Sequence, residues 1–208
     1  MVNVISVANQ KGGVGKTTTT INLAASIADR GYRVLIVDID PQGNATSGLG
    51  IEKSEIDQDI YNVLIDEIPI QDTIHHTSTP KLDMVPATIN LSGAETELIS
   101  MMARETRLKS ALDAISDQYD FVFIDCPPSL GQLSINAFTA SDSILIPVQS
   151  EYYAMEGLSQ LLNTIRLVQK HFNKDLGVEG VLLTMLDART NLGAEVAVSY
   201  THLTLPTI

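Results

Sequence analysis

A glycine-rich loop close to the N-terminus restricts the fold of this chain more than any other feature. Residues 9–18 read Asn-Gln-Lys-Gly-Gly-Val-Gly-Lys-Thr-Thr, between a short apolar run at residues 4–8 and helical spacing at residues 17–30. A loop between a strand and a helix points backbone N–H groups at an anion, and the helix dipole adds positive charge there. Glycines at 12, 13 and 15 let a phosphate approach the backbone closely. The loop therefore predicts a phosphate-binding site.

The end of the loop, Gly-Lys-Thr, predicts that Lys16 reaches the β- and γ-phosphates of a nucleotide and that Thr17 ligates Mg²⁺. The usual pattern has glycine where this chain has Gln10, and Lys11 stands at the beginning of the loop instead. A second ammonium beside Lys16 would be repelled, so we expect Lys11 to point toward phosphates held by a partner subunit. A glycine-rich turn that binds nothing is the alternative. The predicted nucleotide-binding residues are Lys11, Gly12, Gly13, Val14, Gly15, Lys16, Thr17 and Thr18.

Two acidic strand ends complete the predicted site. Residues 121–125 have the form of a Walker B strand, whose terminal Asp125 would hold Mg²⁺ directly or through water. Asp38 and Asp40 follow another apolar strand, and one of them would orient a water molecule for attack on the γ-phosphate. The alternative for each carboxylate is a helix cap or a solvated strand end. The loop Pro127–Gly131 follows the metal carboxylate and is placed to sense the γ-phosphate.

Strand and helix patterns alternate along the chain. Apolar strand patterns cover residues 33–38, 82–85, 121–125, 144–148 and 178–185, and helical patterns cover residues 92–115 and 155–171. The first of these helices begins with a capping-box pattern, Ser92 to Glu95, and its methionines are expected in the core. Residues 48–80 are polar and weakly patterned, with one short helix expected within residues 57–65. The alternation predicts an α/β fold of the P-loop NTPase type, with a mostly parallel twisted sheet and helices on both faces.

Composition narrows the functional classes. The net charge of −12 argues against nucleic-acid binding over the whole surface, because such binding needs a positive footprint, but a local basic patch stays open. The single cysteine, Cys126, excludes an intrachain disulfide, and we expect it to be buried. His75 and His76 have no neighbouring ligands that would make a metal site. No signal peptide and no membrane-length apolar run is apparent, so we expect a cytoplasmic protein.

Together these motifs resemble the ParA family of chromosome and plasmid partitioning ATPases, most of all its bacterial chromosomal branch, Soj. The matching stretches are NQKGGVGKTTTTINLA, VLIVDIDPQGNATSGLG, FIDCPPSLG, IPVQSEYYAMEGLSQLL and VLLTMLDARTNL. The resemblance implies a Mg²⁺-dependent ATPase with a deviant Walker A loop that forms an ATP-sandwich dimer, with Lys11 crossing into the partner's site. It also implies that Asp40 is the carboxylate needed for hydrolysis, so the implied catalytic set is Lys11, Lys16, Asp40 and Asp125.

The resemblance further implies partners. The ATP-bound dimer of the family binds DNA without sequence preference, which would associate the protein with the nucleoid. A ParB-type protein, called Spo0J in this branch, stimulates the slow ATPase, and some chromosomal members influence the replication initiator DnaA. Within this acidic chain, the candidate DNA-binding residues are Arg166, Lys170, Lys174 and Arg189. An ordinary solvated position is the alternative for each of them.

Two related branches and one non-enzymatic role are the competing interpretations. MinD-type ATPases share the two-lysine loop but lack the DPQGNATSGLG run and end in an amphipathic membrane helix, so no membrane partner is expected. Nitrogenase-type iron proteins need two cysteines per chain, which this chain lacks. A nucleotide-binding scaffold that does not cycle is the third. The family pattern stops after Ala197, so we expect one ATPase domain at residues 1–197, incomplete at its C-terminus, and a non-native tail at residues 198–208.

Overall fold

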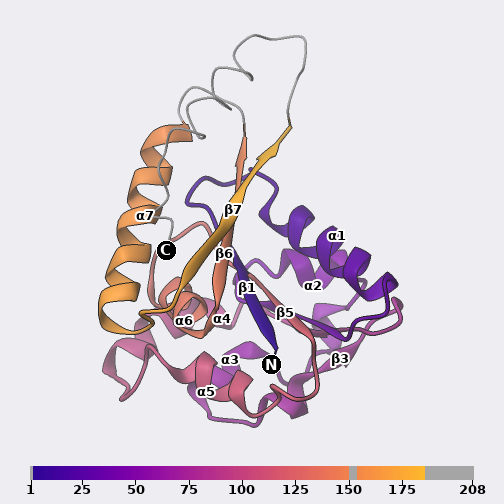
Figure 1. Ribbon diagram of the computed structural model, residues 1–208. Coiled ribbons are helices and arrows are strands. Elements are labelled where there is room, and N and C mark those ends of the chain that lie inside the picture. Colours follow the sequence, from indigo (N-terminus) through magenta and orange to yellow (C-terminus); the bar gives the residue numbers. More distant parts are fainter. Residues whose placement is uncertain (1, 150–153, 186–208) are drawn as a thin grey trace.

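The computed structural model describes residues 2–149 and 154–185, with only the backbone described at residues 154–156. A seven-stranded sheet in the order β3-β4-β2-β5-β1-β6-β7 forms its centre (Figure 1). Every neighbouring pair is parallel except β3 and β4. The strands are β1 (Asn3–Val7), β2 (Val34–Asp38), β3 (His75–His76), β4 (Leu82–Val85), β5 (Phe121–Asp125), β6 (Ser143–Gln149) and β7 (Gly177–Thr184).

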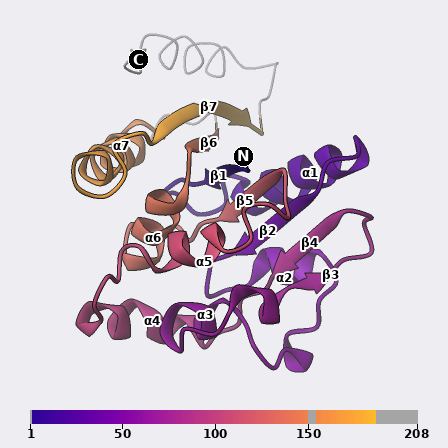
Figure 2. The same ribbon diagram turned by 60° about the horizontal axis from the view of Figure 1, so that its bottom comes forward.

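Helices cover both faces of this sheet, which confirms the predicted fold class. In Figure 1, α1 lies on one side of the sheet and α7 on the other, and Figure 2 shows α3, α4 and α5 gathered together. The helices are α1 (Lys16–Asp29), α2 (Asn44–Gly48), α3 (Ile60–Ile65), α4 (Leu91–Glu97), α5 (Arg107–Asp113), α6 (Gln132–Ala140) and α7 (Ala154–His171). Single 3₁₀ turns lie at Lys53–Glu55, Ile70–Thr73 and Leu98–Ser100. Among the described helices, none combines the length and apolarity needed to cross a membrane.

Alternation of side chains along the strands fills two hydrophobic cores. In β2, Val34 and Ile36 pack with Ala24 and Ala28 of α1. Leu35 and the other residues of the opposite face belong to a larger core shared with α3 to α7. All five residues of β2 are buried, as expected for a strand covered on both faces. Each fully buried Val, Leu or Ile contributes about 1.5–3 kcal/mol, so the central strands form a rigid base for the loops at their ends.

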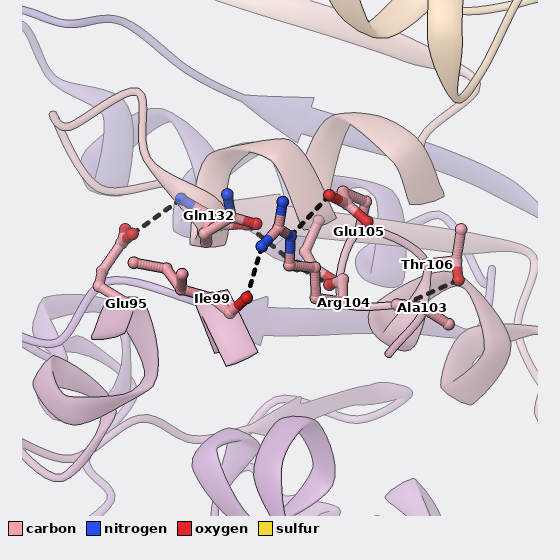
Figure 3. Close-up of polar contacts among 8 residues, drawn as sticks. Glu95, Ile99, Ala103, Arg104, Glu105, Thr106 and Gln132 are labelled. Carbon is pink, nitrogen blue, oxygen red and sulfur yellow. Dashed lines mark hydrogen bonds and ion pairs between the residues drawn. The ribbon is translucent and has the colours of Figure 1, made fainter. Parts of the chain in front are cut away.

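The prediction of one continuous helix over residues 92–115 is wrong, because the chain turns between α4 and α5. Ala103 lies at φ 51°, in the left-handed region that ends a helix. Arg104 holds this turn by donating to the Ile99 carbonyl and pairing with Glu105 at 2.8 Å (Figure 3). Met102 was expected in the core but is 89% exposed on the same turn.

The capping box predicted at Ser92 is also absent, since α4 begins at Leu91 without a side-chain cap. The capping box that does form opens α3, where Asp59 and Asn62 exchange hydrogen bonds with each other's backbone. This short helix lies within residues 57–65, as predicted. Local spacing therefore identified helical segments here, but it misplaced one of their beginnings.

Strand register brings the predicted site residues to one edge of the sheet. Val7 pairs with Asp125, and Asp125 pairs in turn with Asp38 on the other side of β5. The carboxyl ends of β1, β2 and β5 are thus adjacent, and the glycine-rich loop leaves the sheet at the same edge. Open α/β sheets bind ligands at this edge.

Candidate nucleotide-binding site

The glycine-rich loop wraps the N-terminus of α1 with its backbone open to a ligand. Gly13 and Gly15 have φ values of 75° and 89°, a left-handed conformation that side chains disfavour. A Cβ atom built on Gly12 or Gly13 would meet nothing within 4 Å. The space that these glycines leave beside the backbone is a cradle of the kind that phosphate oxygens fill.

Two residues that the sequence reasoning missed hold this loop in place. The Asn9 side chain donates to the Pro147 carbonyl at 2.7 Å and accepts from the Lys11 backbone N–H at 3.0 Å. At the other side, the Thr184 hydroxyl at the end of β7 donates to the Val14 carbonyl at 2.8 Å. Both contacts come from strands far along the chain, so local pattern carried no signal for them.

Lys16 points inward with its ammonium close to the loop. The residue is 8% exposed, and its Nζ donates to the Lys11 carbonyl at 3.2 Å. Burial lowers the pKa of Lys16, while the charge of Asp125 acts in the opposite direction. A buried ammonium beside an open backbone cradle is suited to an anionic ligand, which would supply the compensation that water no longer provides.

Asp125 is bonded to two hydroxyls of α1. Thr17 donates to Asp125 Oδ2 at 2.7 Å, and Thr20 donates to Oδ1 at 3.2 Å. Burial raises the pKa of Asp125 to about 6, against the lowering effect of these two hydrogen bonds. Thr20 was not predicted, although it lies one helical turn after Thr17. A carboxylate and a hydroxyl in contact, next to a phosphate cradle, fit Mg²⁺, which takes few protein ligands and completes its shell with phosphate and water.

Asp38 and Asp40 differ in what they bind. Asp38 is fully buried, and its Oδ2 accepts from the Thr46 hydroxyl at 2.8 Å and from the Thr46 N–H at 2.9 Å. Its Oδ1 accepts from the Asp40 N–H at 3.2 Å. Burial, and then the charge of Asp125, raise the pKa of Asp38 to about 7. Both oxygens of Asp38 are therefore engaged in holding the loop. Asp40 accepts from the Gln42 N–H at 2.9 Å, and its charge acts on both Lys16 and Asp125.

Comparison with known proteins decides the family. A family model described as an AAA domain matches residues 2–178. The sporulation initiation inhibitor protein Soj of Bacillus subtilis is 64% identical over 196 residues, which cover 94% of this chain and 78% of that protein. The chromosome partitioning protein ParA of Myxococcus xanthus is 55% identical, over 93% of this chain and 68% of its own length. The chain belongs to the ParA/Soj family of partitioning ATPases.

Solved structures agree with this fold. A cobyrinic acid a,c-diamide synthase structure from Mycobacterium smegmatis, with bound ADP and magnesium, superposes with a TM-score of 0.94 at 40% identity. The match covers 99% of this chain and 84% of that one. A plasmid partition protein from Borrelia burgdorferi superposes with a TM-score of 0.80 at 26% identity, covering 95% and 84% of the two chains.

The second lysine of the glycine-rich loop, Lys11, lies at the rim of this site. Lys11 is partly exposed, and its Nζ lies 3.5 Å from Gln149 Oε1 at the end of β6. Lys16 is directed into the loop instead. The two ammonium groups therefore have different contacts, and the role of Lys11 at the phosphates of a second subunit stays a prediction.

The other residues singled out by sequence lie outside this cradle. Arg166 and Lys170 are exposed one turn apart on α7, and Lys174 is exposed just beyond it. Arg189 lies outside the described residues. Cys126 is buried as expected, and burial raises the pKa of its thiol. His76 lies on an edge strand and bonds Asp83 at 2.7 Å. Among the described residues, no three or more His, Cys, Asp or Glu side chains cluster so that they could hold a metal ion by themselves.

Proposed function

We propose that this ParA/Soj-family chain is a Mg²⁺-dependent ATPase that partitions DNA by cycling between two states. In the ATP state it forms a sandwich dimer that binds DNA without sequence preference, and hydrolysis stimulated by a ParB-type (Spo0J) partner resets it. One observation carries this proposal. The Thr17 hydroxyl donates to Asp125 next to the glycine-rich loop, where Lys16 is buried. Cytoplasmic location on the nucleoid, and an influence on DnaA, belong to the same proposal.

Each site residue has a distinct part in hydrolysis. The loop N–H groups and the Lys16 ammonium bind the phosphate oxygens of ATP and balance their charge. Thr17 and Asp125 would hold Mg²⁺, which when bound neutralises charge on those oxygens. Asp40 orients the attacking water, and the loop between Asp125 and α6 surrounds the γ-phosphate side. All of these parts lie at the ends of buried strands, in the loops that directly follow them or on the first turn of α1, which keeps them in place.

The dimer gives the cycle its switch. If Lys11 contacts the phosphates of the partner's ATP, those contacts exist only in the dimer, and ATP shifts the population toward it. The dimer then presents the basic residues of α7 twice. In this acidic chain such doubling matters, because phosphate contacts set the affinity for DNA. Arg166, Lys170 and Lys174 are the exposed candidates among the described residues.

The experiment measures ATP turnover with Mg²⁺, with and without non-specific duplex DNA and a ParB-type protein. We expect turnover to rise when both are added. Asp40→Ala should bind ATP but lose turnover, whereas Asp57→Ala, an exposed carboxylate elsewhere, should match the wild type. ATP binding without turnover would support a non-cycling scaffold instead, and ATP-dependent liposome binding would support a MinD-like role.

A second measurement tests the dimer. Light scattering with ATP should show a dimer for the wild type and for Lys109→Ala, a control at an exposed lysine of α5. Lys11→Ala should stay monomeric while it still binds ATP. A Lys11→Ala protein that dimerises and hydrolyses ATP normally would contradict the proposed role of this lysine.

A further inference from the structure

Helix α6 begins without a cap of its own and takes one from α4. The N-cap position is Gly131, which has no side chain to bond the first N–H groups of the helix. Glu95 supplies the acceptors from 37 residues away: its Oε2 accepts from Gln132 N–H at 2.7 Å (Figure 3). Its Oε1 accepts from Leu133 N–H at 3.4 Å. A carboxylate at this end of a helix also interacts favourably with the helix dipole.

The fit between Glu95 and the beginning of α6 leaves no room for a side chain at Gly131. A Cβ atom built there would collide with both oxygens of the Glu95 carboxylate. Gly131 has φ −90° and ψ −159°, an extended conformation that any residue adopts. A side chain at position 131 would therefore displace the Glu95 carboxylate from the beginning of α6, although the backbone there does not demand glycine.

The segment that leads into α4 is fastened to the Asp40 loop. The Ala87 N–H donates to Thr46 Oγ1 at 3.0 Å, and the same hydroxyl donates to Asp38. Asp38 in turn holds the Asp40 N–H. Gly43 closes the contact from the other side, since a Cβ there would lie 2.5 Å from the Ala87 carbonyl. The residues from Ala87 to Glu95 thus connect the loop of Asp40 to the end of the loop that follows Asp125.

We propose that Glu95 is a positioning residue for ATP hydrolysis. Through α4, it fixes the position of the loop after Asp125 relative to the loop that contains Asp40. It would act on the reaction only through the Gln132 and Leu133 amides. Hydrolysis requires both loops to be correctly placed at once, and small displacements of catalytic groups lower kcat strongly. The inference rests on the proposed function and adds a structural connection between the loop that contains Asp40 and the loop that follows Asp125.

Single variants of the full chain test it. Glu95→Ala removes the carboxylate, and Gly131→Ala displaces it while the glutamate is kept. The matched controls are Glu97→Ala and Gly93→Ala on the same helix. Glu97 bonds Tyr61 at 3.1 Å, and a Cβ on Gly93 would crowd its carboxylate at 2.7 Å, so the controls repeat the geometry away from the catalytic loops.

We expect stimulated kcat to fall about tenfold in Glu95→Ala and in Gly131→Ala, with KM for ATP within about twofold of the wild type. Both controls should retain the wild-type kcat. Glu95→Gln keeps one oxygen acceptor and should fall between. Hydrogen exchange at Gln132 and Leu133 should accelerate in Glu95→Ala but not in Glu97→Ala.

The double variant Glu95→Ala/Gly131→Ala separates positioning from a general loss of structure. Without the carboxylate, the added methyl group has room, so the double variant should be no slower than Glu95→Ala alone. Fully additive losses, or a folded Glu95→Ala protein with wild-type kcat, would overturn the inference. If Glu95→Ala does not fold, Gly131→Ala carries the test. A wild-type chain that hydrolyses no ATP overturns the proposed function and this inference with it, whereas active wild type with unaffected variants overturns only the inference.

Discussion

The two ends of the strand pair β2–β5 carry opposite arrangements of charge. At the carboxyl ends, Asp38 and Asp125 are paired in register, and both are buried. At the amino ends, Arg33 and Asp120 form an exposed ion pair of 2.8 Å. One end therefore places like charges together in a low-dielectric site, and the other places opposite charges together in water.

The difference separates the requirements of binding from those of folding. Burial raises the pKa of both carboxyls at the carboxyl end, so ionising them opposes folding at neutral pH. At the amino end, hydrogen bonds from Arg33 lower the pKa of Asp120 to about 2. An arrangement that is unfavourable for the nucleotide-free protein is maintained where Lys16 and a divalent cation would offset it. The end with two buried carboxyls side by side is thus the one that we assign to ATP binding.

Replacing Asp125, the buried carboxyl of the proposed metal site, should have the largest effect on this comparison. We expect Asp125→Asn to lower kcat for ATP at least about a hundredfold, because the amide no longer holds Mg²⁺ beside Thr17. In the same protein, the free energy of unfolding without nucleotide should be unchanged or raised at pH 7, since the burial cost of the charge is gone. ATPase assays and urea denaturation measure the two effects.

Asp120→Asn, at the other end of β5, is the control for this variant. It should leave kcat at the wild-type value. An Asp125→Asn protein that loses stability and activity together would mean that the carboxylate serves the fold, and the contrast between the two ends would fail.

At the buried end of the strand pair, the Asp38 carboxylate is held by Thr46. The contribution of the Thr46 hydroxyl can be tested alone. Thr46→Val leaves the Ala87 N–H without its acceptor and removes one donor from Asp38. We expect a loss of about 1–3 kcal/mol in the free energy of unfolding, the cost of an unsatisfied buried polar group. Thr46→Ser should recover most of it. Equal stability of the valine and serine variants, measured by urea denaturation, would contradict this role.

The sequence was sufficient for features that local pattern encodes. The apolar runs of β1, β2 and β5, the glycine-rich loop and the terminal Asp125 all follow from periodicity and spacing, and they fix which edge of the sheet carries the site. Hydrogen-bond partners that the tertiary fold brings together could not be predicted from local pattern. Asn9 and Thr46 look like ordinary loop and helix residues until the distant segments that they contact are in place.

Glu95 shows why such predictions go wrong. Its position three residues after Ser92 matches a capping box, yet its carboxylate caps a different helix. Both uses satisfy N–H groups at a helix N-terminus, so the residue type was informative about the chemistry and misleading about the partner. The break at Ala103 has the same origin, because contacts around Arg104 override the helical spacing of the neighbouring apolar residues.

The smallest expected effect lies at the exposed end of the strand pair. Asp120 has its pKa lowered in the folded state from an ordinary value of 3.8, so its contribution to stability is present above about pH 4 and is lost as pH falls toward 2. Asp120→Asn should therefore lower Tm at pH 7 by at most about 2 °C, because an ion pair in water is worth little. The difference from wild type should shrink steadily in thermal melts between pH 4 and pH 2. A difference that stays constant over this range would show that the hydrogen bonds to Arg33, and not the ionisation of Asp120, hold the amino ends of the two strands together.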